Sequence, residues 1–353
     1  MADTVGKRLD LPEGVRYPLA QEPTPGDGSS VLIAPGIHWL RMPLPAPLRW
    51  INVWALEDGD GWTIVDTGIW SPETAASWQH AFAGLMHGKS VRRVLVTHMH
   101  PDHCGMAGWL TERFSARLWM TRLEYLTCRL MASDKEAAPH SVLDFYRAAG
   151  WNEDELAHYR SRFGYIGRQI YPMPSGYRRL VDGECLQIGE NSWKVIVGNG
   201  HSPEHACLYC PARKIFISGD QVLPKISSNI SVFPTEPDAN PLKDWMDSLR
   251  RLGPQLSGDT LCLPAHNSPF LDVHNRLGQL LTHHEASLST LLASLRDPCS
   301  VIDVFSILFK KPITRDTIHM ATGEALAHLN YLKALGKVSS VKDDAGVLQW
   351  QAG

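Results

Sequence analysis

The chain has 353 residues, 44% of them hydrophobic, and a formal net charge of -3. Such a chain can form one large domain plus a small one around a sizeable core. The small net charge excludes a global field that would attract nucleic acid or an acidic membrane, so any such binding must come from a local patch.

Residues 1–30 are polar and rich in Pro and Gly, without the apolar core of a secretory signal. No later stretch approaches the length of a membrane span. We therefore expect an N-terminal arm over residues 1–30 of a soluble, cytoplasmic protein with no membrane partner. Seven scattered cysteines favour reduced thiols over a disulfide framework. Cys207 and Cys210 form a lone CxxC that we expect to pack in the core.

Runs of β-forming residues between Gly, Pro and Asp predict successive strands from residue 31 to residue 68. The runs are 37–40, 51–56 and 62–65, with a hairpin turn over 57–61 and an end at Asp66-Thr67-Gly68. Residues 72–87 have the apolar spacing of a helix, and the run 91–96 predicts the next strand. Residues from about 110 to 165 are mostly helical in pattern, which predicts an inserted helical cap.

The strand at 91–96 leads into a cluster of three histidines and one carboxylate within six residues: His98, His100, Asp102 and His103. Crowding these side chains is unfavourable unless a cation holds them, so the cluster predicts a metal site. Its spacing suggests two ions, with His98 and His100 on one and Asp102 and His103 facing another. The alternative is a solvated histidine-rich loop.

The same pattern of a strand followed by a short turn recurs along the chain. Strands are expected at 184–188, 193–197, 214–217 and 260–263. Five times, an apolar strand ends in a Gly- or Pro-bearing turn that offers a ligand: Asp66, the cluster from His98 to His103, His201, Asp220 and His266. Loops at one edge of a rigid sheet are where sites are built, so we expect these five turns to meet.

Taken together, these motifs resemble those of the metallo-β-lactamase superfamily of hydrolases, closest in pattern to its glyoxalase II-like branch. The motifs that carry the resemblance are Val65-Asp66-Thr67-Gly68, His98-x-His100-x-Asp102-His103, Gly200-His201-Ser202-Pro203, Gly219-Asp220 and Leu263-Pro264-Ala265-His266. The resemblance covers about residues 31–270. It implies an α+β fold, the four-layer αβ/βα sandwich of the family, with the metals at one edge between two sheets.

The resemblance also implies a ligand set. His98, His100 and His201 would hold the first metal, Asp102, His103 and His266 the second, and Asp220 would bridge them. Asp102 and Asp66 are the candidate catalytic carboxylates, and Asp66 resembles a group that orients a ligand or the attacking water. The cofactors would be two divalent ions, zinc in the first place, with iron and manganese as alternatives.

This site would act on an ester, thioester or lactone-type small substrate through a bridging hydroxide. An Asp at position 220 argues against an antibiotic-degrading lactamase of the Cys-ligand type. Glu204 departs from the small residue that relatives often carry there, and we expect it and His205 to make local hydrogen bonds. Lys225, Ser227 and Asn229 are candidate substrate contacts in the loop after Asp220.

Beyond His266 the pattern changes. Residues 273–295, 301–305 and 323–335 predict helices, and 338–341 with Leu348 and Trp350 predict a small hairpin. This mostly helical domain, residues 271–353, resembles the winged-helix-like tail of some hydrolases of this fold, including an endoribonuclease subgroup. Five basic residues could bind RNA, or could be solvated on a packing or homodimerisation module: Lys310, Lys311, Arg315, Lys333 and Lys337.

Two alternative functions follow from these features. The first is an endoribonuclease or phosphodiesterase that uses the C-terminal domain for RNA. The second is a mononuclear iron dioxygenase acting on a thiol or persulfide, with His98, His100 and either Asp220 or His201 as ligands.

Overall fold

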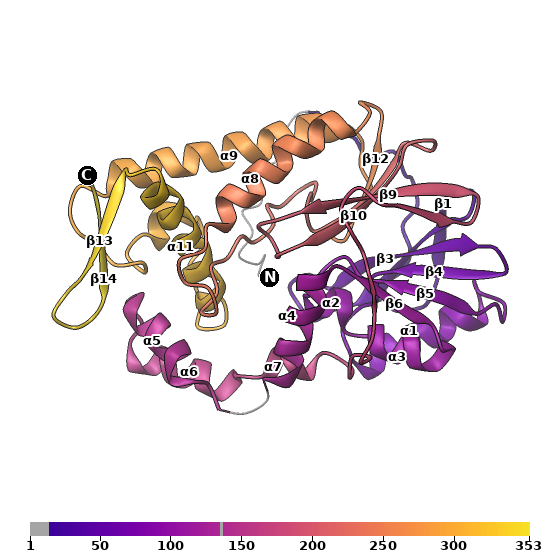
Figure 1. The fold of residues 1–353 in the computed structure, drawn as a ribbon, viewed down its shortest axis with the longest axis horizontal. Helices are drawn as coiled ribbons and strands as arrows, with labels where there is room; N and C mark the ends of the chain where they lie inside the picture. Colours follow the sequence, from indigo (N-terminus) through magenta and orange to yellow (C-terminus); the bar gives the residue numbers. More distant parts are fainter. Residues whose placement is uncertain (1–13, 135–136) are drawn as a thin grey trace.

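The computed structural model describes residues 14–134 and 137–353. Two β-sheets face each other in it, and helices cover the outer face of each (Figure 1). The first sheet follows chain order: β1 (Ser30–Ala34), β2 (Ile37–Pro43), β3 (Trp50–Asp58), β4 (Gly61–Val65), β5 (Val91–Leu95), β6 (Arg117–Met120) and β7 (Arg178–Arg179). The second runs in the order β12-β11-β10-β9-β8: β8 (Cys185–Ile188), β9 (Asn191–Gly198), β10 (His205–Cys210), β11 (Ile215–Gly219) and β12 (Leu261–Pro264).

Strand direction places the ends of the strands that carry the motifs. Strands β4 and β5 are parallel, with Val65 opposite Leu95, so the residues after both emerge at one edge of the sheet. Strands β11 and β12 are also parallel, with Ile217 opposite Leu263. The turns that follow β11 and β12 therefore emerge together as well.

Three buried clusters separate four layers. Between the sheets, Trp39, Trp54 and Leu95 of the first sheet pack with Leu208 and Ile217 of the second. The outer face of the first sheet packs on α1 (Pro72–Ala83) and α3 (Ala107–Phe114) through a cluster that includes Val53, Ile64, Trp78 and Leu110. The outer face of the second sheet packs on α8 (Pro241–Leu252) and α9 (Val273–Ser294) through a cluster that includes Phe216, Trp245 and Leu277. A short 3-10 helix, η1 (Gly253–Gln255), follows α8.

The expected strands and the helix over 72–87 are present, although α1 already ends at Ala83. The segment expected to be mostly helical, about 110–165, is not helical throughout, because β6 lies within it. Leu118 and Met120 are buried while Arg117 is exposed, the two-residue period of a strand, and Leu118 pairs with Val94. The four helices follow β6: α4 (Arg122–Ser133), α5 (His140–Ala148), α6 (Glu153–Arg162) and α7 (Tyr165–Arg168).

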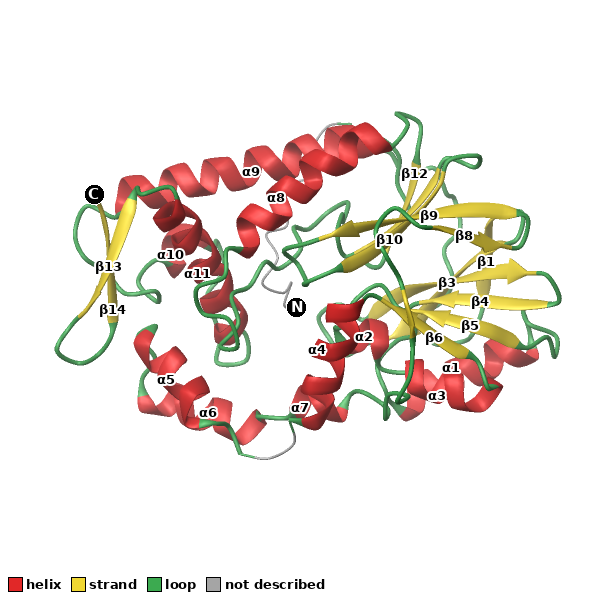
Figure 2. Cartoon of the chain, in the orientation of Figure 1, coloured by secondary structure: helices red, strands yellow, loops and turns green. Residues whose placement is uncertain are grey.

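Helices α5 and α6 pack against the C-terminal part of the chain and lie away from the sheets (Figure 2). The Nε1 of Trp151 donates a 2.9 Å hydrogen bond to Oγ1 of Thr322, and the ring of Trp151 stacks on Tyr146 with centroids 4.2 Å apart. The inserted segment thus connects the first sheet, which α4 and α7 adjoin, to the C-terminal helices.

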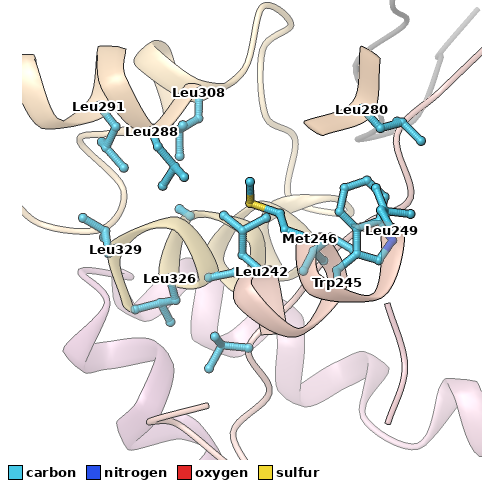
Figure 3. Packing of buried hydrophobic residues seen from close by; sticks show 14 of the residues in the cluster. Leu242, Trp245, Met246, Leu249, Leu280, Leu288, Leu291, Leu308, Leu326 and Leu329 are labelled. Carbon is cyan, nitrogen blue, oxygen red and sulfur yellow. The ribbon is translucent and has the colours of Figure 1, made fainter. Parts of the chain in front are cut away.

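The C-terminal part contains α9, α10 (Phe305–Leu308), α11 (Ile318–Ala334) and an antiparallel hairpin of β13 (Val338–Lys342) and β14 (Leu348–Ala352). Figure 3 shows the apolar contact between these helices and α8, which includes Leu242, Met246, Leu288, Leu326 and Leu329. The helix expected at 301–305 begins only at Phe305. The reason is local, since the Asp303 carboxylate accepts hydrogen bonds from the Ser300 amide and hydroxyl and closes a turn there.

Residues 1–13 of the expected arm lie outside the described residues, and residues 14–29 form no helix or strand. All seven cysteines are free. Cys207 and Cys210 both pack in apolar cores, on opposite faces of β10, as the sequence predicts for this pair. Among the described helices, none has both the length and the apolar character needed to cross a membrane.

Candidate metal centre

The five turns predicted to carry ligands meet at one edge of the two sheets. Asp66 follows β4, and the histidine cluster follows β5, with its second half in the one-turn helix α2 (Pro101–Cys104). His201 lies between β9 and β10, Asp220 follows β11 and His266 follows β12. The structure thus brings together all seven residues expected as ligands, and they form three overlapping donor groups: His98, His100 and His201; His98, His103 and Asp220; Asp102, His103 and His266.

The first group places three imidazole nitrogens around one point. The Nε2 of His98 lies 2.8 Å from Nδ1 of His100 and 3.1 Å from Nε2 of His201. The Nδ1 of His100 lies 3.1 Å from Nε2 of His201. The three nitrogens come from two turns about a hundred residues apart in the chain, His98 and His100 on one and His201 on the other.

Hydrogen bonds on the far side of two of these rings assign their protons. The Nδ1 of His201 donates to the carbonyl oxygen of Asn229 at 2.8 Å, so its Nε2 has a lone pair. The Thr97 hydroxyl gives its one proton to the Asp66 carboxylate, so Nδ1 of His98 donates to the hydroxyl oxygen and Nε2 of His98 also has a lone pair. One proton on His100 cannot satisfy both lone pairs, whereas a cation among the three nitrogens does.

The second group joins a carboxylate to two imidazoles. The Oδ2 of Asp102 lies 3.3 Å from Nε2 of His266 and 3.6 Å from Nε2 of His103. The Nδ1 of His103 donates to Oδ2 of Asp66 at 2.8 Å, which leaves a lone pair on Nε2. That buried Nε2 has no hydrogen-bond partner among the described residues.

Asp220 lies between the two groups. Its Oδ2 is 3.5 Å from Nε2 of His201 in the first group and 3.6 Å from Nε2 of His103 in the second. Its Oδ1 is 3.6 Å from Nε2 of His266 and has no hydrogen-bond partner among the described residues. These separations are too long for hydrogen bonds. Ligands at about 2.1 Å from one tetrahedral cation lie about 3.4 Å apart, so the donor set fits a cation on each side of Asp220.

Burial sets the protonation of the first group. It lowers the pKa of His98 well below its usual range, that of His100 to about 3, and that of His201. Neutral imidazole is the form that binds a metal. The first group is therefore poised for a cation near neutral pH.

The second group is charged. Burial lowers the pKa of His103, but Asp102, Asp66 and Asp220 outweigh it and raise that pKa well above its usual range. Burial raises the pKa of the Asp102 carboxyl, but His103 and His266 outweigh it and lower that pKa to about 2. For Asp220 the same two imidazoles outweigh burial and hold its pKa well below its usual range. A cation here would replace the imidazole proton opposite these carboxylates.

Asp66 is buried and faces the ligands from behind. Its Oδ1 accepts the Thr97 amide at 2.8 Å, and its Oδ2 accepts from His103. The positive φ of 60° at Asp66 turns the chain directly after β4 so that the carboxylate reaches both groups. Asp66 thus contacts a ligand of the second group, while its own oxygens are occupied by protein donors.

Glu124 of α4 is a functional candidate that the motifs did not reveal. Its carboxylate is buried and accepts the Met99 amide at 2.8 Å, the Ser202 hydroxyl at 2.6 Å and the Glu204 amide at 2.7 Å. It therefore joins the turn of His98 and His100 to the turn of His201. Burial raises the pKa of the Glu124 carboxyl to about 7, against the effect of these hydrogen bonds. The only signal in the sequence is a carboxylate on the buried face of α4, beside Tyr125 and Cys128.

The residues next to His201 make the local hydrogen bonds expected of them. The carboxylate of Glu204 accepts the Leu123 amide at 2.9 Å, and Nε2 of His205 accepts the Asp220 amide at 3.1 Å. Of the expected substrate contacts, Ser227 is instead buried against His284, and Asn229 holds His201 through its carbonyl oxygen. Lys225 lies over the ring of Tyr17. The loop after Asp220 therefore supports the centre from outside.

Comparison with known proteins agrees with this geometry. Residues 48–266 match the model of the metallo-beta-lactamase superfamily, and residues 288–353 match a metallo-beta-lactamase-like C-terminal domain. The crystal structure of a beta-lactamase domain protein from Burkholderia ambifaria is 40% identical, with a TM-score of 0.88 over 96% of this chain and 98% of that one.

Two curated relatives carry names that describe an activity. The probable metallo-hydrolase YqjP of Bacillus subtilis is 23% identical over 85% of this chain and 93% of its own length. The acyl-coenzyme A thioesterase MBLAC2 of Gallus gallus is 25% identical over 53% of this chain and 63% of its own length. The family match covers the two facing sheets and all five ligand turns, and the chain belongs to the metallo-beta-lactamase superfamily.

Proposed function

We propose that this protein is a hydrolase that binds two divalent metal ions and cleaves acyl thioesters. The observation that carries the proposal is the position of Asp220, whose carboxylate lies 3.5 Å from His201 of one donor group and 3.6 Å from His103 of the other. One carboxylate shared by two groups is the arrangement that a two-metal hydrolase requires. Imidazole and carboxylate ligands suit zinc, and also iron and manganese.

Divalent cations at these two positions supply a nucleophilic water near neutral pH and polarise a carbonyl oxygen. The protein's own side chains determine where this chemistry occurs. His98, His100 and His201 would hold one ion, while Asp102, His103 and His266 would hold the other. Asp220 places negative charge between the two positions and so sets their separation.

Asp66 and Asp102 have different roles in this proposal. Asp66 acts through His103, because its hydrogen bond fixes the ring tautomer that presents Nε2 to the cation. Asp102 is only partly buried, with a side chain 19% exposed. Its carboxylate is therefore the ligand oxygen best placed to accept a proton from the attacking water.

The thioester assignment is supported by an apolar surface that begins beside the centre. Helix α4 starts there, since Glu124 binds the ligand turns, and Leu123, Leu126 and Leu130 follow on its exposed side. These leucines are 44–53% exposed, and Tyr165 and Ile166 of α7, which packs on α4, are 45% and 44% exposed. Exposed apolar side chains in a continuous row mark a binding surface. The row spans about 10 Å along the helix, and we assign it to the acyl chain.

The name of the MBLAC2 relative, an acyl-coenzyme A thioesterase, supports the same class of substrate. The likeness to the glyoxalase II-like branch remains part of this proposal, as does the winged-helix character of the C-terminal part. The order of α10, α11 and the hairpin β13–β14 supports the latter.

No observation in the described residues favours the endoribonuclease or the mononuclear dioxygenase. Of the expected basic patch, Arg315 lies 3.7 Å from the Asp154 carboxylate, and Lys333 lies over the ring of Trp350. Two complete donor groups support a two-ion centre over a single iron. Both alternatives remain predictions that the following experiment addresses.

The test is a substrate panel offered to protein loaded with zinc, iron or manganese. The panel contains acyl thioesters of increasing chain length, the matching oxygen esters, a lactone, a phosphodiester and a thiol persulfide with oxygen electrodes. We expect metal-dependent thioester hydrolysis that a chelator removes and added metal restores. Turnover of the phosphodiester alone, or oxygen uptake with the persulfide, would overturn the proposal.

A further inference from the structure

The loop between β11 and α8, which follows Asp220, is held by the C-terminal helices. The guanidinium of Arg276 on α9 donates to the carbonyl oxygens of Leu223 at 2.6 Å and Ile226 at 2.9 Å. The hydroxyl of Ser227 lies 3.1 Å from Nε2 of His284, also on α9. Arg276 and His284 are both buried, so these contacts are shielded from water. The first half of the loop is thus fixed by α9.

The second half of the loop is fixed by α11. The amide of Val232 donates to the carbonyl oxygen of Gly323 at 3.0 Å. A Cβ on Gly323 would lie 2.7 Å from the Ser231 side chain and 2.9 Å from the Val232 carbonyl oxygen, so the loop and the helix are in direct contact. Only glycine at position 323 allows the two backbones to approach this closely.

Asn229 connects α11 to the first donor group. Its side-chain amide donates to Oε2 of Glu324 at 3.1 Å, and its Oδ1 accepts the Ser231 hydroxyl at 2.6 Å. Its backbone carbonyl accepts the Nδ1 proton of His201 at 2.8 Å. With both ends of the side chain held, the direction of this carbonyl is set by α11.

We propose that Glu324 is a positioning residue of the metal centre, which through Asn229 fixes the tautomer and ring orientation of His201. The C-terminal helices are then a structural part of the first metal site. This inference rests on the proposed two-ion centre and extends it to a residue outside the five ligand turns. The carboxylate of Glu324 is 6% exposed, and the hydrogen bond from Asn229 is one of its anchors.

The size of the effect follows from how such supports act elsewhere. Removing a group that orients a metal-binding histidine typically weakens metal affinity about 10- to 100-fold. Glu324 acts at one remove and on one site only. We therefore expect a loss of about 10-fold for the first site and no change at the second.

The experiment is a zinc titration in competition with a chromophoric chelator, which resolves two dissociation constants. Glu324→Ala should weaken one of them about 10-fold. Glu324→Gln keeps an acceptor oxygen for the Asn229 amide and should restore most of the affinity. Asn229→Ala removes the same hydrogen bond from the loop side and should match Glu324→Ala.

Thr322→Val is the matched control. It lies on the same helix and is also buried, but its hydroxyl accepts from Trp151 of the inserted segment and does not contact the loop. It should lower the free energy of unfolding while leaving both dissociation constants unchanged. A general loosening of α11 would instead weaken zinc binding in Thr322→Val as much as in Glu324→Ala, and the positioning role would be wrong.

The remaining outcomes separate this inference from the proposed function. A parent protein that binds no zinc, or one ion, contradicts the two-ion centre itself. A parent that binds two ions, with Asn229→Ala folded and both dissociation constants within about twofold of the parent, overturns the role of Glu324 alone. Should Glu324→Ala fail to fold, Asn229→Ala and Glu324→Gln decide the question.

Discussion

The Nδ1 of His103 donates a 2.8 Å hydrogen bond to Oδ2 of Asp66, and the buried Nε2 on the other side of that ring has no hydrogen-bond partner among the described residues. One contact therefore determines which nitrogen of His103 is available to a cation. Asp66 in turn is held by the amide and hydroxyl of Thr97, directly before the histidine cluster.

Asp66→Asn should weaken binding at the second site without removing it. An amide facing Nδ1 favours the tautomer that places the proton on Nε2 of His103, where the cation would lie. We expect a loss of about 10- to 100-fold in affinity for one ion. Competition titration with zinc measures it, and unchanged binding of both ions would show that Asp66 does not set the tautomer.

Glu124 should make stability depend on pH. Its pKa in the folded protein is about 7, compared with a model value of 4.5. The folded state therefore binds this proton more tightly than the unfolded chain does, and the contribution of Glu124 is largest below pH 4.5. It falls as the pH rises towards 7, by about 3 kcal/mol in total.

The measurement for Glu124 is the free energy of unfolding in urea at several pH values from 5 to 8, with metal removed. The difference between Glu124→Gln and the parent should shift in favour of the variant as the pH rises, since glutamine does not titrate. Exposed Glu236→Gln is the control and should follow the parent at every pH. A constant difference across the range for Glu124→Gln would contradict the prediction.

Much of the centre could be predicted from the sequence because its ligands follow strands. A turn after a parallel strand emerges at one known edge, so Asp66, Asp220 and His266 could be placed together before any coordinates existed. Glu124 and Glu324 could not, because their roles depend on which helix face packs against which turn. The contact between Trp151 and Thr322 was equally inaccessible, since no local pattern relates segments so distant in the chain.

Two local differences have the same kind of cause. Strand β6 is only four residues long, too short to stand out between helical patterns, and its pairing with β5 decides its conformation. The helix expected at 301–305 loses its first turn to the hydrogen bonds of Asp303. In both places, partners outside the window override the local preference.

The exposed leucines of α4 should determine the preference for acyl chain length. Leu126→Glu and Leu130→Glu place a charge in the proposed path of the chain. We expect kcat/KM to fall about 10-fold or more for long-chain thioesters and little for acetyl thioesters, as the loss of one buried leucine contact implies. Leu335→Glu is the control, with a leucine that is 54% exposed after α11. An equal loss for all chain lengths would remove the acyl assignment.

Charge reversal in the C-terminal part tests the RNA alternative. If that part packs and does not bind RNA, reversing Lys310, Lys311 and Lys337 should leave thioester turnover unchanged. The parent should then show no salt-dependent affinity for RNA that the variant loses. Binding assays at several salt concentrations decide, because phosphate contacts weaken steeply as salt rises. A salt-dependent affinity abolished by the reversal would establish an RNA-binding surface.

The metal content of the purified chain, prepared without chelators and compared with that of Asp220→Asn, tests the central proposal most directly. The Asp220 carboxylate contacts both donor groups, so its neutral substitute should loosen both positions. We predict two divalent ions per chain in the parent and the loss of at least one in the folded variant. One ion per chain in the parent, or two ions retained by Asp220→Asn, would contradict a centre built around Asp220.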